Sequence, residues 1–308
     1  FMYIGIDCGT QGTKAIVVDF SQRKVIGIGY AKHDLIEQSN GRREQHPNWW
    51  IEALKQALEI ALRQAKKSPH FSPNLVKGIG ISGQQHGLVI LDKYDQPLYN
   101  AKLWCDTETT DENDELIEKL GGQKAAFEKL GIMCQTGYTA SKLMWFRKHY
   151  PEKFTQIKKV MLPHDYLNYW LTGNFCTEFG DASGTGYFDI INRKWSNEVF
   201  SKIAPELVMN DVLPTLLSAE KKLGVLKPEI AALFGFNKSV TVSTGGGDNM
   251  MGAIGTGNIH EGIATMSLGT SGTLYASTNR FLSNLPPMIA NFCSSSNGWL
   301  PLICVMNM

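Results

Sequence analysis

Apolar and polar residues alternate along the first part of the chain with the period of half-buried strands. Two apolar runs, joined by a tight loop with two glycines, extend over residues 4–18, and a third run covers 24–32. From Pro47 onward the apolar residues recur with helical spacing, at Trp50, Ile51, Leu54, Leu58, Ala61, Leu62 and Ala65. We therefore predict a β-hairpin, a third strand and a helix over 47–67.

Strands and helices remain mixed along the rest of the chain, which is typical of the α/β class. Strand patterns fall at 76–82, 88–91, 158–162, 240–243, 263–268 and 274–276. Helical patterns fall at 106–120, 124–130, 141–149, 164–171, 198–203, 228–234 and 250–254, and residues 177–195 are predicted to be irregular. A break at 235–238 predicts a first domain over 1–237 and a second over 238–308.

The loop of the first hairpin has a second copy far downstream. Its sequence is Gly9-Thr10-Gln11-Gly12-Thr13, and the pattern returns as Gly269-Thr270-Ser271-Gly272-Thr273 between two further strand-like runs. Two such hairpins in one chain suggest a duplicated fold with a cleft between its halves.

Composition narrows the class of protein. The chain has 308 residues, of which 43% are hydrophobic, and its formal net charge is +1, so its charge favours neither nucleic acid nor an anionic membrane. No apolar run approaches the roughly 20 residues that span a bilayer. The six cysteines lack the spacing of zinc ligands. We expect reduced thiols in a cytoplasmic protein.

The predicted second domain is small, because about 70 residues are few for a partner that closes a cleft. The chain also stops inside the apolar segment 299–306. We expect the C-terminal part of the natural protein to lie beyond residue 308.

The first hairpin loop has the residue types of a phosphate site. Glycines let backbone N–H groups approach phosphate oxygens, threonine hydroxyls add donors, and a carboxylate at a strand end can hold Mg²⁺. The candidates are Asp7, Gly9, Thr10, Gly12 and Thr13, with Lys14 as an added positive charge. An ordinary hairpin with a glycine turn and an exposed lysine would explain the same residues.

Two further segments end in side chains suited to a polyol. Gln84-Gln85-His86-Gly87 follows a predicted strand, and we favour substrate contact by Gln85 and His86 over a purely structural histidine. Trp104 can pack on the apolar face of a sugar. Asp106 can bind hydroxyls, or it can equally begin the next helix as its N-cap.

A glycine-rich segment near residue 248 holds the candidate for a general base. Its sequence is Gly245-Gly246-Gly247-Asp248-Asn249, between a predicted strand and a predicted helix. The glycines leave Asp248 open to a substrate, where its carboxylate could take a proton from an attacking hydroxyl. The alternative is a glycine-rich turn with a capping aspartate.

Two other motif matches carry less weight. The G-x-G-x-x-G match at 78–83 falls inside a predicted strand and is not followed by a helix, as a dinucleotide site would require. His164-Asp165 resembles part of a hydrolase triad, but no G-x-S-x-G elbow accompanies it.

Taken in order, these segments resemble the FGGY family of carbohydrate kinases. The resemblance runs through Ile4-Gly5-Ile6-Asp7-x-Gly9-Thr10, Gln45-x-Pro47-x-x-Trp50, Gly83-Gln84-Gln85-His86-Gly87, Leu103-Trp104-x-Asp106, Lys142-Leu143-x-Trp145, Leu162-Pro163-His164-Asp165, Gly245-Gly246-Gly247-Asp248-Asn249 and Ser267-Leu268-Gly269-Thr270-Ser271-Gly272. Within the family, the segments are most similar to those of kinases that act on xylulose.

The resemblance implies an actin-like fold of two ribonuclease-H-like α/β domains, the second incomplete here, with sugar and ATP in the cleft. It implies ATP-dependent phosphorylation of a ketopentose, D-xylulose to D-xylulose 5-phosphate. By similarity, Asp248 would be the general base and Asp7 would help to place Mg²⁺. The sugar would contact Gln85, His86, Trp104, Asp106, Asp248 and Asn249. The phosphate loops would be Gly9, Thr10, Gly12, Thr13 and Lys14, and Gly269, Thr270, Ser271 and Gly272.

Two residues depart from the family pattern. Gln85 stands where many relatives have methionine, and Glu108 stands where an arginine is common, so both changes concern the choice of sugar. The alternatives are a kinase for ribulose, gluconate, rhamnulose, glycerol or another polyol, and an actin-like or Hsp70-like ATPase that acts on a protein partner. A homodimer, and a fragment that binds sugar without catalysing transfer, are both compatible with the sequence.

Overall fold

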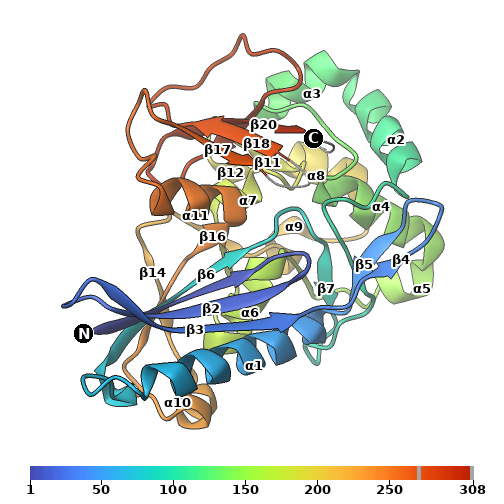
Figure 1. Cartoon of the computed structure of the whole chain (residues 1–308). Coiled ribbons are helices and arrows are strands. Elements are labelled where there is room, and N and C mark those ends of the chain that lie inside the picture. The colour runs from blue at the N-terminus through green and yellow to red at the C-terminus, as the bar shows by residue number, and fades with distance from the viewer. Residues whose placement is uncertain (269–271, 306–308) are drawn as a thin grey trace.

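The largest sheet of the computed structural model carries the first hairpin (Figure 1). Its strand order is β14 (Lys222–Val225), β15 (Thr241–Ser243), β6 (Val76–Gly83), β1 (Met2–Cys8), β2 (Gly12–Asp19) and β3 (Lys24–Lys32), and β16 (Gly246–Gly247) also pairs with β6. β1 is antiparallel to β2 and parallel to β6. The structure describes residues 1–268 and 272–305.

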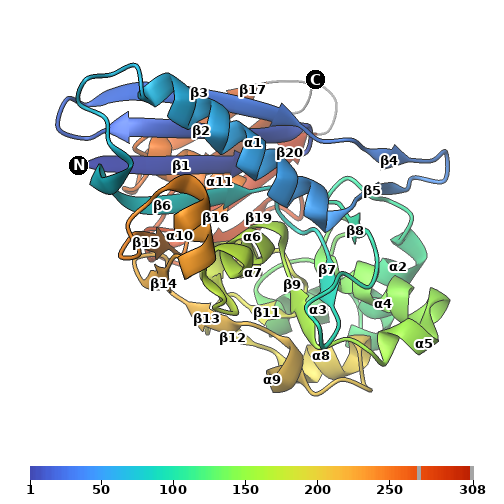
Figure 2. The same ribbon diagram turned by 90° about the horizontal axis from the view of Figure 1, so that it is seen from below.

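Helix α1 (Pro47–Ala65) covers one face of this sheet, as Figure 2 shows. Pro47 occupies the first turn, and the ring of His46 accepts a hydrogen bond of 3.2 Å from the N–H of Asn48. The helix lies very close to β3, because a β-carbon at Gly29 would be only 1.9 Å from the carbonyl oxygen of Ala57. Helices α6 (Pro163–Thr172) and α10 (Pro228–Phe234) add apolar residues to the same core.

A second core lies within the helical part of the chain. Its larger helices are α2 (Thr110–Leu120), α3 (Gln123–Leu130), α4 (Thr139–His149) and α8 (Asn197–Ile203). The short helices α5 (Pro151–Phe154), α7 (Phe179–Ala182) and α9 (Met209–Val212) also contribute buried residues to it. The 3₁₀ helix η1 (Pro73–Leu75) lies before β6 and has no buried residues. Short strands pair as β7 (Val89–Leu91) with β9 (Lys159–Met161), β10 (Cys176–Glu178) with β13 (Thr215–Leu217), and β11 (Phe188–Asp189) with β12 (Lys194–Trp195). A small sheet has the order β4 (Ile36–Glu37), β5 (Arg43–Gln45) and β8 (Ala101–Lys102).

The last sheet packs against this second core. Its order is β17 (Ala264–Leu268), β18 (Gly272–Ala276), β20 (Trp299–Val305) and β19 (Ala290–Cys293). In Figure 1 it lies above helix α11 (Asp248–Gly255), which follows β16 of the large sheet. The antiparallel pairing of β17 with β18 forms the second predicted hairpin.

The structure confirms the α/β class and corrects two details of the sequence prediction. Helix α2 begins at Thr110 and not at 106, because the preceding residues are held in a turn by the side chain of Asp106. The segment 177–195, predicted to be irregular, contains α7, β11 and β12, which are too short to show a period. Strands on both sides of position 237/238 belong to the large sheet; the domain division there stays a prediction.

In the described part of the chain, no helix combines the length and the apolar character needed to cross a membrane.

Candidate active site

Three parallel strands of the large sheet end at one edge, and a candidate site residue lies at each end. Cys8 of β1 pairs with Gly83 of β6, and Gly83 pairs with Gly247 of β16. Parallel strands in this register release their next residues on the same side of the sheet. The pairing therefore brings Asp7, the Gln85 loop and Asp248 together from widely separated parts of the chain.

A cavity of about 400 Å³ opens beside this edge. Five predicted site residues line it: Gln85, His86, Trp104, Asp248 and Asn249. The other lining residues are Cys105, Thr107, Gln135, Gly137 and Tyr138, with Ser267, Thr273, Met288, Ala290, Phe292, Leu302 and Cys304 from the last part of the chain. The lining thus combines polar side chains with aromatic and aliphatic ones, which suits a small polar ligand.

Asp248 is the first residue of α11, and its carboxylate faces this cavity. Its Oδ1 accepts hydrogen bonds from the backbone N–H of Asn249 at 2.8 Å and from Asn249 Nδ2 at 3.1 Å. Water reaches the side chain, yet the walls of the cleft limit its hydration. This desolvation, together with the negative charge of Asp7, raises the pKa of Asp248 to about 7. A carboxylate that titrates near neutrality is well matched to accept a proton.

Asn249 links Asp248 to the loop that follows β6. Besides its bond to Asp248, Asn249 Nδ2 donates to Gln85 Oε1 at 2.9 Å. Gln85 is buried, and a β-carbon at Gly247 would lie 2.7 Å from its Cγ. Gly247, which precedes Asp248, therefore allows the two loops to approach closely. Gln85, which stands where many relatives have methionine, is part of this contact.

His86, which lines the cavity, is held in an unusual backbone conformation. Its φ of 67° lies in the left-handed region, and its ring packs between Tyr138, with ring centroids 4.8 Å apart, and Phe292, at 5.8 Å. Burial and the nearby charge of Lys142 lower the pKa of His86 to about 3. The imidazole is therefore neutral and can exchange hydrogen bonds with a hydroxyl group.

The first hairpin loop is braced by Gln45, for which the sequence predicts no specific role, and by Trp104, a predicted sugar contact. Gln45 Nε2 donates to the carbonyl oxygens of Thr10 at 2.7 Å and Asp34 at 2.9 Å, while Gln45 Oε1 accepts from Trp50 Nε1 and from Gln84 Nε2. Trp104 Nε1 also donates to Thr10 Oγ1 at 2.9 Å. Gln45 and Trp50 belong to a motif of the family resemblance, and that motif is the only feature of the sequence that pointed to a role for them near the site.

Replacing Gln45 by methionine should destabilise the protein, because the buried groups that it satisfies would lose their partners. We expect the free energy of unfolding to fall by about 2–3 kcal/mol, since each orphaned buried polar group costs about 1–3 kcal/mol. Urea unfolding measures the change. Gln38→Met, at an exposed position, serves as the control, and equal stability of the two variants would contradict the bracing role.

Two of the polar groups predicted to contact phosphate are already hydrogen-bonded within the protein. The hydroxyl of Thr13 is buried and bonds to His33 Nε2 at 2.8 Å, and the N–H of Gly9 donates to the carbonyl oxygen of Gly12 at 3.0 Å. Lys14 is exposed on β2, opposite Asp7. In the second loop, Gly269, Thr270 and Ser271 lie outside the described residues, and Gly272 begins β18.

Asp106 is buried away from the cavity and is not the N-cap of α2. Its carboxylate accepts hydrogen bonds from the N–H groups of Arg43 at 2.9 Å and Glu108 at 3.0 Å, and from Lys102 Nζ at 3.1 Å. The N-cap is Thr109. Glu108, the second departure, pairs with Lys102 and with Arg42 at 2.9 Å. These bonds connect the segment that follows Trp104 to β5 and β8.

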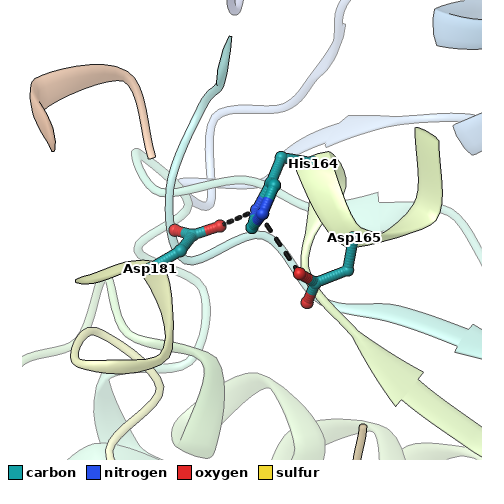
Figure 3. Close-up of side chains that lie close together, drawn as sticks. All are labelled: His164, Asp165 and Asp181. Atoms are coloured by element: carbon teal, nitrogen blue, oxygen red, sulfur yellow. Dashed lines mark hydrogen bonds and ion pairs between the residues drawn. The ribbon is translucent and has the colours of Figure 1, made fainter. Parts of the chain in front are cut away.

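A buried cluster of His164, Asp165 and Asp181 lies next to Gly83 of β6 (Figure 3). His164 Nδ1 contacts the Asp181 carboxylate and is 3.4 Å from Asp165 Oδ1. Burial raises the pKa of Asp165 to about 7. None of the three residues lines the cavity, so His164 has the contacts of a structural histidine and does not face a substrate.

The two hairpins, the large sheet and the cleft define the actin-like class of ATPase fold. The structure of a protein titled "xyloylose kinase" from Brucella ovis superposes with a TM-score of 0.90 and 34% identity, over 100% of this chain and 61% of that chain. Residues 2–255 match the N-terminal domain of the FGGY family of carbohydrate kinases. The chain belongs to the FGGY family of carbohydrate kinases.

Relatives in this family share most of the sequence. A xylulose kinase from Haemophilus influenzae is 80% identical over 306 residues, which cover 99% of this chain and 62% of the relative. A xylulose kinase from Escherichia coli K12 is 36% identical over 95% of this chain and 57% of the relative. The chain thus spans about 60% of the length of these relatives.

Proposed function

We propose that this protein transfers the γ-phosphoryl group of ATP to a hydroxyl of a ketopentose, converting D-xylulose to D-xylulose 5-phosphate. The observation that carries the proposal is the position of Asp248, which lines the cavity with Gln85 and His86 at the sheet edge where Asp7 also lies. The names of the relatives in this family support the choice of sugar.

Asp248 would accept the proton of the attacking hydroxyl, and Asn249 would hold the carboxylate in place through its hydrogen bond. The neutral ring of His86 and the side chains of Gln85 and Trp104 would orient the sugar. The first hairpin loop, braced by Gln45, would face the phosphates. Phosphoryl transfer depends mainly on such alignment and on charge neutralisation.

The residues near Asp7 fit a hard cation. Asp7 is exposed at the end of β1 and accepts a hydrogen bond from Ser82 Oγ at 2.8 Å, which leaves its other carboxylate oxygen available. Oxygen ligands of this kind suit Mg²⁺. Asp7 would hold the ion, which when bound neutralises phosphate charge. We also propose a cytoplasmic location, because all six cysteines are free thiols.

The test is a coupled assay of ADP release by the complete gene product over a panel of D-xylulose, D-ribulose, L-rhamnulose, gluconate and glycerol. We expect the highest kcat/KM with D-xylulose. A higher value with another acceptor would overturn the choice of sugar. ATP turnover that a peptide stimulates and no sugar does would favour the ATPase alternative, against which the Gln85-His86 pocket already argues.

The rate should depend on pH through Asp248. Because the base must be ionised and its pKa is raised to about 7, kcat/KM is expected to fall as the pH drops below about 7. In metal-free Asp7→Asn the like charge is gone, so the pKa of Asp248, followed by NMR titration of its carboxyl carbon, should be lower than in the metal-free wild type. An unchanged pKa in that comparison would contradict this coupling.

A further inference from the structure

Lys142 of α4 is fully buried, and its ammonium group donates hydrogen bonds to two backbone carbonyls. It bonds to the carbonyl oxygen of His86 at 3.0 Å and to that of Gly137. Among the described residues, no carboxylate lies within ion-pair distance of Lys142. The other fully buried lysine, Lys102, is surrounded by the carboxylates of Glu44, Asp106 and Glu108.

The two carbonyls belong to two different segments that line the cavity. His86 lies in the loop after β6 and Gly137 in the turn before α4, and both residues line the cavity. Thr139 Oγ1 donates a second hydrogen bond, of 3.1 Å, to the His86 carbonyl. Since His86 has a positive φ that a non-glycine residue adopts only under constraint, these bonds oppose its relaxation.

A buried cation without an ion-pair partner is unfavourable for folding. Burial accordingly lowers the pKa of Lys142 to about 7. Perturbed, buried groups of this kind are more common at functional sites than elsewhere. An apolar side chain of similar size could fill the same space at lower cost, so packing alone does not explain a lysine at this position.

We propose that Lys142 is a positioning residue for the sugar, which holds the His86 loop and the Gly137 turn at the separation that the cavity requires. The inference rests on the proposed function for the identity of the sugar, although the geometry of the two loops does not depend on it. Lys142 does not line the cavity; it acts through the two backbone segments.

The test is Lys142→Met in the complete gene product, with Lys148→Met as the matched control. Lys148 is on the same helix, is 53% exposed and pairs with Glu112, away from the cavity. In Lys142→Met we expect KM for D-xylulose to rise about tenfold while kcat changes less than about threefold, because ground-state binding is lost and the base is untouched. Both constants should be unchanged in Lys148→Met. An unchanged KM in folded Lys142→Met would overturn the proposal.

A second variant and a spectroscopic measurement cover the other outcomes. Thr139→Val removes only the hydroxyl donor to the same carbonyl and should raise KM for D-xylulose several-fold. It tests the proposal even if Lys142→Met does not fold. The NMR signals of the His86 ring should shift in both variants and not in Lys148→Met, and unshifted signals would refute the positioning role. Absence of D-xylulose turnover in the wild type would refute the proposed function alone, since the NMR comparison needs no substrate.

Discussion

Replacing Asp248 by asparagine is expected to lower kcat for sugar-dependent ADP release by about 10²–10⁴-fold, the usual contribution of a general base. Asparagine keeps the shape and the position at the start of α11, but its amide cannot take the proton of the attacking hydroxyl at neutral pH. The effect should therefore fall on kcat, measured in the coupled ADP assay with the complete gene product.

Sugar binding separates the loss of the base from a loss of structure. Calorimetry with D-xylulose should give a Kd for Asp248→Asn within about threefold of the wild type. Asp114→Asn, at an exposed position on α2, should leave both kcat and Kd unchanged. Turnover near the wild-type rate in Asp248→Asn would remove Asp248 from the role of base.

The second large effect is expected at Gly184, which lies directly against the ring of His86. A β-carbon at this position would be 2.0 Å from His86 Cε1 and Nδ1. The ring cannot simply move aside, because Tyr138 and Phe292 pack against it. Gly184→Ala should therefore displace the imidazole, raise KM for the sugar at least about tenfold and lower the free energy of unfolding by about 1–3 kcal/mol.

Gly255→Ala is the matched control, since a β-carbon there has no atom within 4 Å among the described residues. Gly255 ends α11, where alanine is at least as favourable as glycine. Steady-state kinetics and thermal unfolding should show no loss for this variant. If Gly184→Ala were to keep the wild-type KM, His86 would have no part in sugar binding.

Much of the fold follows from local sequence patterns. The alternation in β1 to β3 and the apolar stripe of α1 each reflect a single element burying one face, so they can be read without knowledge of the rest of the chain. The elements missed in 177–195 are only two to four residues long. A strand or helix of that length is stabilised by its tertiary neighbours and leaves no periodic signal.

The site was predicted from motif order and residue type, and the structure sorts those candidates by where their side chains point. Gln85, His86, Trp104, Asp248 and Asn249 line one cavity. Thr13 and Asp106 have residue types equally suited to ligand contact, but their polar atoms are bonded inside the protein. Residue type and spacing cannot distinguish these cases, because the bonding partner is distant in sequence.

The sequence by itself determined the α/β class, the two glycine-threonine hairpins and the candidate base, since each depends on neighbouring residues or on a motif. Only the tertiary structure decided which of these come together. The parallel register of β1, β6 and β16 brings Asp7, the Gln85 loop and Asp248 to one edge. The tertiary structure also shows that Gln45 and Lys142 donate hydrogen bonds to backbone carbonyls of the surrounding loops. Long-range pairing of this kind depends on packing of the whole chain and not on any local pattern.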